Sequence, residues 1–296
     1  MNPIIIIGEG IHVVSKEISK AIERRNPEPI QRLARLQAEA GADYLDLNLG
    51  PLTKNSVEIA QWIVTTVQEV TNLPLSIDTP NPEAMEAALN ICRDRPLINS
   101  ASGMKESKEK MLPLAQKYST DVIVLLINDN GLPSDAEDRA VITMEIVEYA
   151  NSLGIQNENI WIDGVLMPVC VNQEQIVQYL EFLKMVPNLV PGVKTVVGLS
   201  NISSCGTPKD LRGILNRTFM AMISRYNQSA VIADVLDKEL IQLTRGELPE
   251  VLKLVYGIMD GEEIFQKNLT EREIAYIKSV DVLLGRKFYS HSWLER

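Results

Sequence analysis

Near its N-terminus the chain reads IIIIGE (residues 4–9), a short run of isoleucines that ends in the carboxylate Glu9. Seven similar runs follow, and most of them end in a carboxylate or an amide: YLDLNLG (44–50), LSID (75–78), LINS (97–100), VIVLLIN (122–128), IWID (160–163), VVGLSN (196–201) and VIAD (231–234). A helical pattern follows nearly every run, and alternating strands and helices predict parallel pairing. Eight such units predict an α/β fold, the closed (β/α)8 TIM barrel, with its site at the carboxyl ends of the strands.

The helices expected after these runs span residues 27–41, 55–72, 82–92, 105–117, 135–153, 172–186, 211–226 and 237–245. Asn26 and Asn81 each precede a proline, a pattern typical of a helix start. Residues 55–58, 134–137 and 270–273 resemble capping boxes. We therefore expect a barrel over residues 1–262 and a C-terminal helical extension over residues 263–296. The extension is expected to pack on the barrel or a subunit neighbour, with partner recognition as the alternative.

Composition excludes several classes of protein. The 296 residues carry a net charge of −10, which argues against nucleic acid as a partner because phosphate neutralisation needs a basic face. No run approaches the roughly 20 apolar residues of a membrane span, and no signal sequence is evident, so we expect a cytoplasmic protein. Cys92, Cys170 and Cys205 form no C-x-x-C pair, which favours buried thiols over disulfides or zinc.

The polar residues at the strand ends should converge on one pocket. They comprise five carboxylates and four amides: Glu9, Asp46, Asp78, Asp163, Asp234, Asn48, Asn99, Asn128 and Asn201. The set lacks lysine, since Lys194 lies at the start of its strand, so no Schiff-base nucleophile is expected. Only two histidines, His12 and His291, occur in the chain, and no bound metal is expected.

Carboxylates and amides can pair with a flat heterocycle that is rich in N–H donors and ring-nitrogen acceptors. An ionised carboxylate accepts from two adjacent N–H groups, and an asparagine offers both donors and an acceptor. A 2-amino-4-oxo pterin presents such an edge. For any one residue, capping of the following helix competes with this interpretation. An oxygen-ligated Mg²⁺ is a further alternative. A ligand shared by most of the eight strands is the better account of the whole set.

Several segments support a family resemblance. In order they read GEGI (8–11), LDLNLGP (45–51), IDTPN (77–81), LINS (97–100), IDGVLMP (162–168), GLSNIS (198–203), NRTFMAM (216–222) and IAD (232–234). Together they resemble the methyltetrahydrofolate:corrinoid protein methyltransferases of the pterin-binding barrel superfamily, over roughly residues 4–262. The same superfamily contains dihydropteroate synthases and the folate module of cobalamin-dependent methionine synthase.

The resemblance implies roles for individual residues. Asp78, Asn99 and Asp163 match the positions that hydrogen-bond the pterin edge in that family, and Asn201 matches the asparagine that contacts N5 and helps to activate the methyl group. Asp46 and Asn48 match polar residues that form the floor beside the pterin, and Glu9 occupies the position of the glutamate on the family's first strand. The remaining pterin-binding candidates, Asn128 and Asp234, are two further residues at strand ends. The chain departs from the family where Gly10 and His12 replace the usual arginine and asparagine, and where residues 203–208 run longer.

The implied activity is transfer of a methyl group, in either direction, between N5 of methyltetrahydrofolate and the Co(I) corrinoid of a separate corrinoid protein. No D-x-H-x-x-G segment is present, so the corrinoid (cobalamin) must arrive on that partner. The family also implies a homodimer. The partner belongs either to acetyl-CoA synthesis or, as the departures and the tail slightly favour, to demethylation of methylamines, betaines or methoxyaromatics.

Two alternatives remain. A dihydropteroate synthase-like enzyme needs cations near the last two strands to bind a diphosphate, and residues 199–201 and 233–234 contain none. A non-catalytic folate-binding subunit would not need the activating asparagine.

Overall fold

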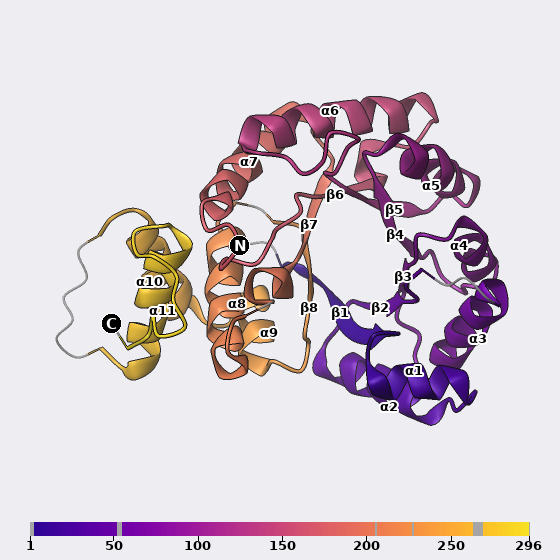
Figure 1. Cartoon of the computed structure of the whole chain (residues 1–296), viewed down its shortest axis with the longest axis horizontal. Helices are drawn as coiled ribbons and strands as arrows, with labels where there is room; N and C mark the ends of the chain where they lie inside the picture. Colours follow the sequence, from indigo (N-terminus) through magenta and orange to yellow (C-terminus); the bar gives the residue numbers. More distant parts are fainter. Residues whose placement is uncertain (1–2, 52–54, 205, 227, 263–268, 296) are drawn as a thin grey trace.

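The chain folds into a closed barrel of eight parallel strands that follow one another in sequence order (Figure 1). The computed structural model describes residues 3–51, 55–204, 206–226, 228–262 and 269–295. The strands are β1 (Ile5–His12), β2 (Tyr44–Asn48), β3 (Leu75–Asp78), β4 (Leu97–Ser102), β5 (Asp121–Leu125), β6 (Ile160–Asp163), β7 (Lys194–Gly198) and β8 (Ala230–Ala233). The predicted (β/α)8 barrel is confirmed, and each expected run contributes one strand.

Helices surround the barrel, and those that were expected all form. They are α2 (Glu28–Ala40), α3 (Ser56–Gln68), α4 (Pro82–Leu89), α5 (Lys105–Lys117), α6 (Ala136–Ser152), α7 (Gln175–Leu189), α8 (Lys209–Ser224) and α9 (Lys238–Arg245). A short helix, α1 (Lys16–Glu23), precedes α2 and was not predicted. It buries Ile18, Ala21 and Ile22 along one side, and this stripe spans too few turns to stand out in the sequence.

The predicted helix starts are partly correct. The Asn81 side chain accepts from the amides of Glu83 and Ala84, and Asn26 accepts from the amide of Glu28 at 3.3 Å. The box at 55–58 was wrong, because Asn55 has φ +52° and its side chain makes no cap bond. The box at 134–137 was shifted by one residue: Asp135 is the N-cap.

A layer of apolar side chains fills the interior of the barrel on the side of the amino-terminal ends of the strands. It is formed by Ile7, Leu97, Ile123, Trp161, Val196 and Ala230. Because residues two apart on a strand share a face, Leu97 in this layer places Asn99 on the inner face as well. The filled interior therefore leaves a cup at the carboxyl ends of the strands.

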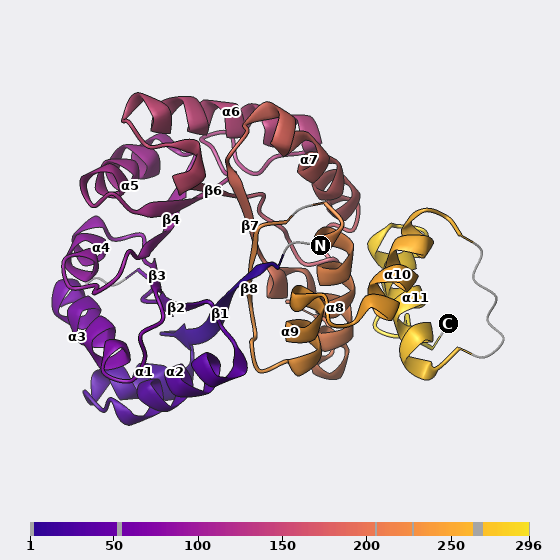
Figure 2. The same ribbon diagram turned by 180° about the vertical axis from the view of Figure 1, so that it is seen from behind.

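Two further helices are α10 (Pro249–Met259) and α11 (Glu271–Leu283). They lie against α8 on its far side from the barrel strands (Figures 1 and 2). Thr270 forms the predicted capping box of α11 with Glu273. Both helices contact α8, so the extension packs on the barrel of its own chain. The division at residue 262 stays a prediction.

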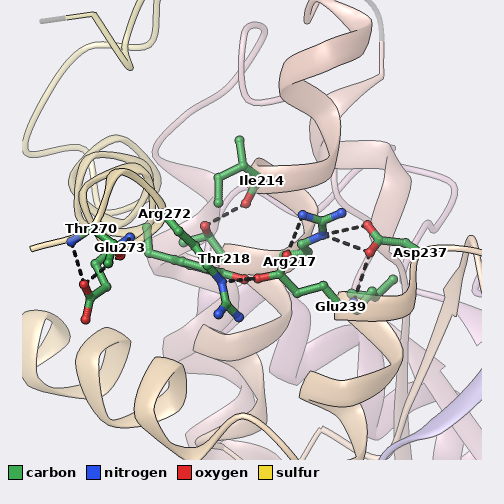
Figure 3. A network of polar contacts seen from close by, with 10 residues as sticks. Ile214, Arg217, Thr218, Asp237, Glu239, Thr270, Arg272 and Glu273 are labelled. Atoms are coloured by element: carbon green, nitrogen blue, oxygen red, sulfur yellow. Dashed lines mark hydrogen bonds and ion pairs between the residues drawn. The ribbon is translucent and has the colours of Figure 1, made fainter.

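Polar contacts fasten α11 to the barrel (Figure 3). Glu239 accepts from Arg217 Nη1 at 2.8 Å, Arg272 Nε at 2.7 Å and Tyr276 Oη at 2.9 Å. Arg217 Nε also donates to both carboxylate oxygens of Asp237. One carboxylate of α9 thus joins helices α8 and α11.

The segment after α11 returns to the loops at the mouth of the barrel. The Tyr289 hydroxyl lies 2.7 Å from Thr207 Oγ1, between β7 and α8. The Tyr289 amide donates to Gln173 Oε1, between β6 and α7, at 3.1 Å. The tail therefore braces two loops that follow strands of the barrel.

The cysteine prediction was partly wrong. Cys92 is half-buried, but Cys170 is exposed, in the loop that follows β6. Cys205 lies outside the described residues. Among the helices of the described ranges, none combines the length and apolar character required to span a bilayer.

We expect Glu239→Ala to lower the free energy of unfolding by about 2 kcal/mol, because the buried Tyr276 hydroxyl, the half-buried Arg217 and the exposed Arg272 all lose a charged acceptor. Glu109→Ala, which removes an exposed carboxylate from α5, is the matched control and should change stability by less than about 0.5 kcal/mol. Urea denaturation followed by circular dichroism measures both. Equal stability of the two variants would contradict the bridging role of Glu239.

Candidate active site

Strand register brings three predicted residues into one row. In the parallel ladder Asn48 is the partner of Asp78, and Asp78 is the partner of Asn99. Partners in register on adjacent strands point to the same side of a sheet, here into the barrel. The Asn48 side-chain amide donates to Asp78 Oδ2. Neighbouring strand ends therefore present an acceptor and amides side by side.

Asp46 lies one layer below this row, since it precedes Asn48 by two residues. Its Oδ1 accepts from Ser76 Oγ at 2.7 Å and from Asn99 Nδ2 at 2.9 Å. Asp46 is 5% exposed and Asn99 6% exposed. Asp46 thus holds the Asn99 amide in place and forms the floor of the cup.

Asp163 ends β6 and is also buried. Its carboxylate accepts from the amide of Val165 at 2.8 Å and from the amide of Gly198 on β7. Behind this loop the buried Arg139 of α6 donates from Nε to the Gly164 carbonyl at 3.0 Å. Burial disfavours the ionised form of Asp163. The backbone donors and the nearby Arg139 cation partly offset this effect.

Glu9 and Asn201 lie on the side of the cup formed by β1 and β7. Ser200 Oγ donates to Glu9 Oε2 at 2.9 Å. Asn201 is exposed in the 3-10 helix η2 (Leu199–Ser203). A Cβ at Gly198 would lie 2.9 Å from Asn201 Nδ2, so glycine leaves the space that this side chain uses.

The structure does not bring Asn128 or Asp234 into this network. Asn128 lies three residues beyond β5, and its Oδ1 accepts from the Asn130 amide at 2.9 Å. Asp234 is exposed, and its Oδ1 accepts from the Leu236 amide at 2.9 Å. Both side chains bond to amides of their own turns and do not cap the following helices, whose N-caps are Asp135 and Asp237. Their contact with a pterin stays a prediction.

The buried carboxyl groups have raised pKa values. Burial, followed by the charge of Asp46, raises the pKa of Asp78 to about 8. Burial raises the pKa of Glu9 to about 7. Burial likewise raises the pKa values of Asp46 and Asp163 to about 6 each. Near neutral pH the cup therefore holds both ionised and protonated carboxyl groups, and a ligand that supplies N–H donors favours the ionised forms.

No cluster of three or more His, Cys, Asp or Glu residues suited to a metal ion occurs in the described part of the chain. The carboxylates of the cup are instead bonded to serine hydroxyls, side-chain amides and backbone amides. These partners orient the carboxylates toward hydrogen-bond donors.

Sequence reasoning missed several residues around the cup. Ser76 and Ser200 hold Asp46 and Glu9, and spacing two before Asp78 would have placed Ser76 on the inner face. The strand ends themselves carry no lysine, but sequence reasoning missed two cations that approach them from a helix. Lys209 and Arg212, from the first turn of α8, line a cavity beside Ser200. They follow the strand by about ten residues, so the strand-end pattern did not include them.

The backbone conformation at position 10 explains why this chain has a glycine there. Its φ is +118°, and the register between β1 and β2 shifts between Gly8 and Ile11. An arginine at this φ would be strained. The bulge carries β1 on to His12, whose Cα is the partner of Asn48 in the ladder. In this chain His12 therefore lies at the level of the polar row.

Comparison with known proteins gives a consistent result. Residues 14–233 match a family profile described as "Pterin binding enzyme". The chain is 28% identical over 239 residues to a methylcorrinoid:tetrahydrofolate methyltransferase from Eubacterium limosum, covering 80% of this chain and 87% of that protein. It is 23% identical over 228 residues to a methionine synthase from Mycobacterium leprae, covering 73% of this chain but only 19% of that longer protein.

Among solved structures, 7,8-dihydropteroate synthase from Vibrio fischeri superposes with a TM-score of 0.66 at 14% identity, covering 84% of this chain and 94% of that one. At that identity the likeness shows a common fold and nothing more.

We expect the unliganded protein to lose stability as pH rises from 6 to 8.5. Asp78 and Glu9 hold protons in the folded state at pH values where the unfolded chain has released them, so each deprotonation lowers the free energy of unfolding. The total decrease should be at least about 2 kcal/mol. Asp78→Asn removes one titrating group and should flatten the profile. Denaturation midpoints across this range measure the effect, and a profile that rises would contradict the raised pKa values.

Proposed function

The chain belongs to the pterin binding enzyme family, and from that premise we propose that it transfers a methyl group between N5 of methyltetrahydrofolate and a reduced corrinoid carried by a separate protein. The similarity to a methylcorrinoid:tetrahydrofolate methyltransferase over most of both chains supports this activity.

The observation that carries the proposal is the row formed by the half-buried Asn48 and Asp78 and the buried Asn99 above Asp46. A pterin presents adjacent N–H donors from its 2-amino group and N3, and an ionised Asp78 or Asp163 accepts from such a pair. Asn99 supplies a donor and an acceptor in the same cup. Apolar side chains below the floor exclude water, which strengthens each of these hydrogen bonds.

The chemical difficulty of the reaction lies at N5. When the bond between the methyl carbon and N5 breaks, the electron pair stays on nitrogen, and this is unfavourable unless N5 is protonated or strongly hydrogen-bonded. A reduced corrinoid supplies the nucleophile that accepts the methyl group. The protein must hold the pterin and polarise N5. We assign this donor role to Asn201, whose side chain lies in η2 beside Gly198.

Glu9 is a candidate proton reservoir for this step. Burial raises its pKa to about 7, so the carboxyl group is partly protonated at neutral pH. It is bonded to Ser200, the residue directly before Asn201. A proton held at Glu9 thus lies beside the loop that contacts N5 in this proposal.

The mouth of the barrel suits an apolar partner. Six exposed apolar side chains lie in the loops or first helical turns that follow strands: Val14, Val57, Met104, Leu132, Val171 and Leu236. They are six of the ten large apolar side chains that are exposed among the described residues. All six lie at the end of the barrel that carries the cup, and this distribution supports an interaction site there. We propose that the corrinoid protein docks here. The homodimer and the cytoplasmic location stay predictions.

Mixing methyltetrahydrofolate with reduced free corrinoid, and following the corrinoid absorption, tests the activity. Turnover supports the methyltransferase, whereas binding without turnover favours a non-catalytic folate-binding subunit. Because Lys209 and Arg212 lie near β8, the absence of cations no longer argues against a dihydropteroate synthase-like enzyme. Incubation with a dihydropterin diphosphate and 4-aminobenzoate tests that alternative, and we expect no dihydropteroate.

Asn201→Ala should lower kcat/KM for methyl transfer about 100-fold, since loss of one transition-state donor costs on the order of 3 kcal/mol. Asn188→Ala is the matched control: this asparagine is exposed near the C-terminal end of α7, far from the carboxyl ends of the strands, so the activity of the variant should equal that of the parent. An unchanged rate for Asn201→Ala would remove this residue from the mechanism.

Asp163→Asn should raise the Kd for methyltetrahydrofolate at least about tenfold, because a neutral amide replaces a charged acceptor worth about 1.5–3 kcal/mol. The amide oxygen can still accept from Val165, so the loop is expected to keep its shape. Isothermal titration calorimetry measures the affinity, and the melting temperature monitors folding. A stable variant with the parent Kd would contradict the role of Asp163 at the pterin edge.

A further inference from the structure

A cavity of about 460 Å³ adjoins the cup on the side of β8. Glu9 and Ser200 form its boundary with the cup, and the first two turns of α8 form another wall. Its volume lies within the roughly 300–1,000 Å³ of pockets that bind small molecules. The pterin-binding groups Asp78, Asn99 and Asp163 do not line it, so it offers space for another part of a ligand.

Two cations line the cavity, Lys209 and Arg212. The ion pairs formed within the described ranges include neither of them, although the chain as a whole has ten more acidic than basic residues. Arg212 Nε donates to the Thr207 carbonyl at 3.0 Å, which positions the guanidinium. Three acidic residues also line the cavity. Asp237 is neutralised by Arg217, and Asp234 is exposed. Glu9 is bonded to Ser200, and burial raises its pKa to about 7, so it is partly protonated at neutral pH. Two cations are therefore available for an anionic ligand.

The lining also contains a hydrogen-bond acceptor without a donor. The Oδ1 atom of Asn216 is buried and has no hydrogen-bond partner among the described residues. An unsatisfied buried acceptor costs about 1–3 kcal/mol, and a ligand N–H removes that cost. The cavity thus combines cations for carboxylates with an acceptor for an amide. A diphosphate has no N–H group, whereas an acidic peptide has both features.

The orientation of the folate connects this cavity to the cup. On a pterin ring N5 is bonded to C6, and C6 carries the p-aminobenzoyl-glutamate substituent. If Asn201 meets N5, the substituent leaves the cup beside η2. Ser200, Ser203 and Ser204, which flank Asn201, all line the cavity. In that orientation the substituent would point toward the cavity.

We propose that this cavity is a binding subsite for the γ-linked glutamate tail of a folate, with Lys209 and Arg212 binding its carboxylates and Asn216 accepting from an amide N–H. The inference rests on the proposed function and deepens it, because it makes polyglutamylated folates the preferred substrate class. Lys209 and Arg212 determine specificity and take no part in the chemistry at N5.

The test compares two probes by calorimetry at low salt: 5-methyltetrahydrofolate with three γ-linked glutamates, and 5,6-dimethyltetrahydropterin, which has no tail. In the Lys209→Gln/Arg212→Gln variant the triglutamate should bind about tenfold more weakly than in the parent, and the tail-less pterin should bind equally well. Lys209→Gln alone, which keeps the Arg212 contact to Thr207, should give about threefold. The difference should shrink at about 0.5 M salt because exposed charges are screened.

Lys238→Gln is the matched control, since Lys238 is the exposed first residue of α9 and does not line the cavity. It should bind both probes as the parent does. The proposal is overturned if the double variant keeps the parent affinity for the triglutamate, or if both probes weaken equally. Inorganic pyrophosphate that binds the parent more tightly than free γ-triglutamate would also overturn it. A parent that binds neither pterin would refute the proposed function itself.

Discussion

Closure of the parallel barrel is the constraint on which the rest of the structure depends. Eight strands in sequence order leave no free edge, so the register between neighbours is set all the way round. That register carries Asn48, Asp78 and Asn99 to the same level on three adjacent strands. A shift of one residue in any of these strands would turn its polar end toward the surrounding helices and its apolar residues into the cup. The strand register that closes the barrel therefore also fixes the positions of the polar residues in the cup.

The cup concentrates acidic groups where water is scarce. Burial, and for Asp78 the neighbouring charge of Asp46, raise the pKa values and disfavour full ionisation. Serine hydroxyls and amides offset part of this cost at Asp46, and backbone amides do so at Asp163. The carboxylate oxygens that still lack hydrogen-bond donors form an acceptor surface, and this surface favours a ligand with N–H donors. In the proposed function, the same carboxyl groups that destabilise the unliganded protein above neutral pH accept from the N–H donors of the pterin edge.

The reactive side of the cup is supported from outside the barrel. Loops after β6 and β7 are braced by Tyr289 of the C-terminal tail through Gln173 and Thr207. Behind them α11 is fastened to α8 and α9 through Glu239. The extension therefore contributes to the shape of the mouth, although it supplies none of the polar residues of the cup. Asn201 and the cavity lined by Lys209 and Arg212 both depend on this region.

The sequence alone determined the alternation of elements, because apolar runs of strand length and capped helices are local patterns. It also determined that carboxylates and amides lie at the strand ends, since closure of a parallel barrel brings those ends together whatever the loops do. Only the tertiary structure decided which of them meet. Asp46 accepts from Asn99 and Asp78 accepts from Asn48, whereas Asn128 and Asp234 bond to their own turns. Likewise α1, the positive φ of Gly10 and the approach of Lys209 and Arg212 arise from loop paths and helix placement. These depend on contacts between residues far apart in the chain, which no local pattern encodes.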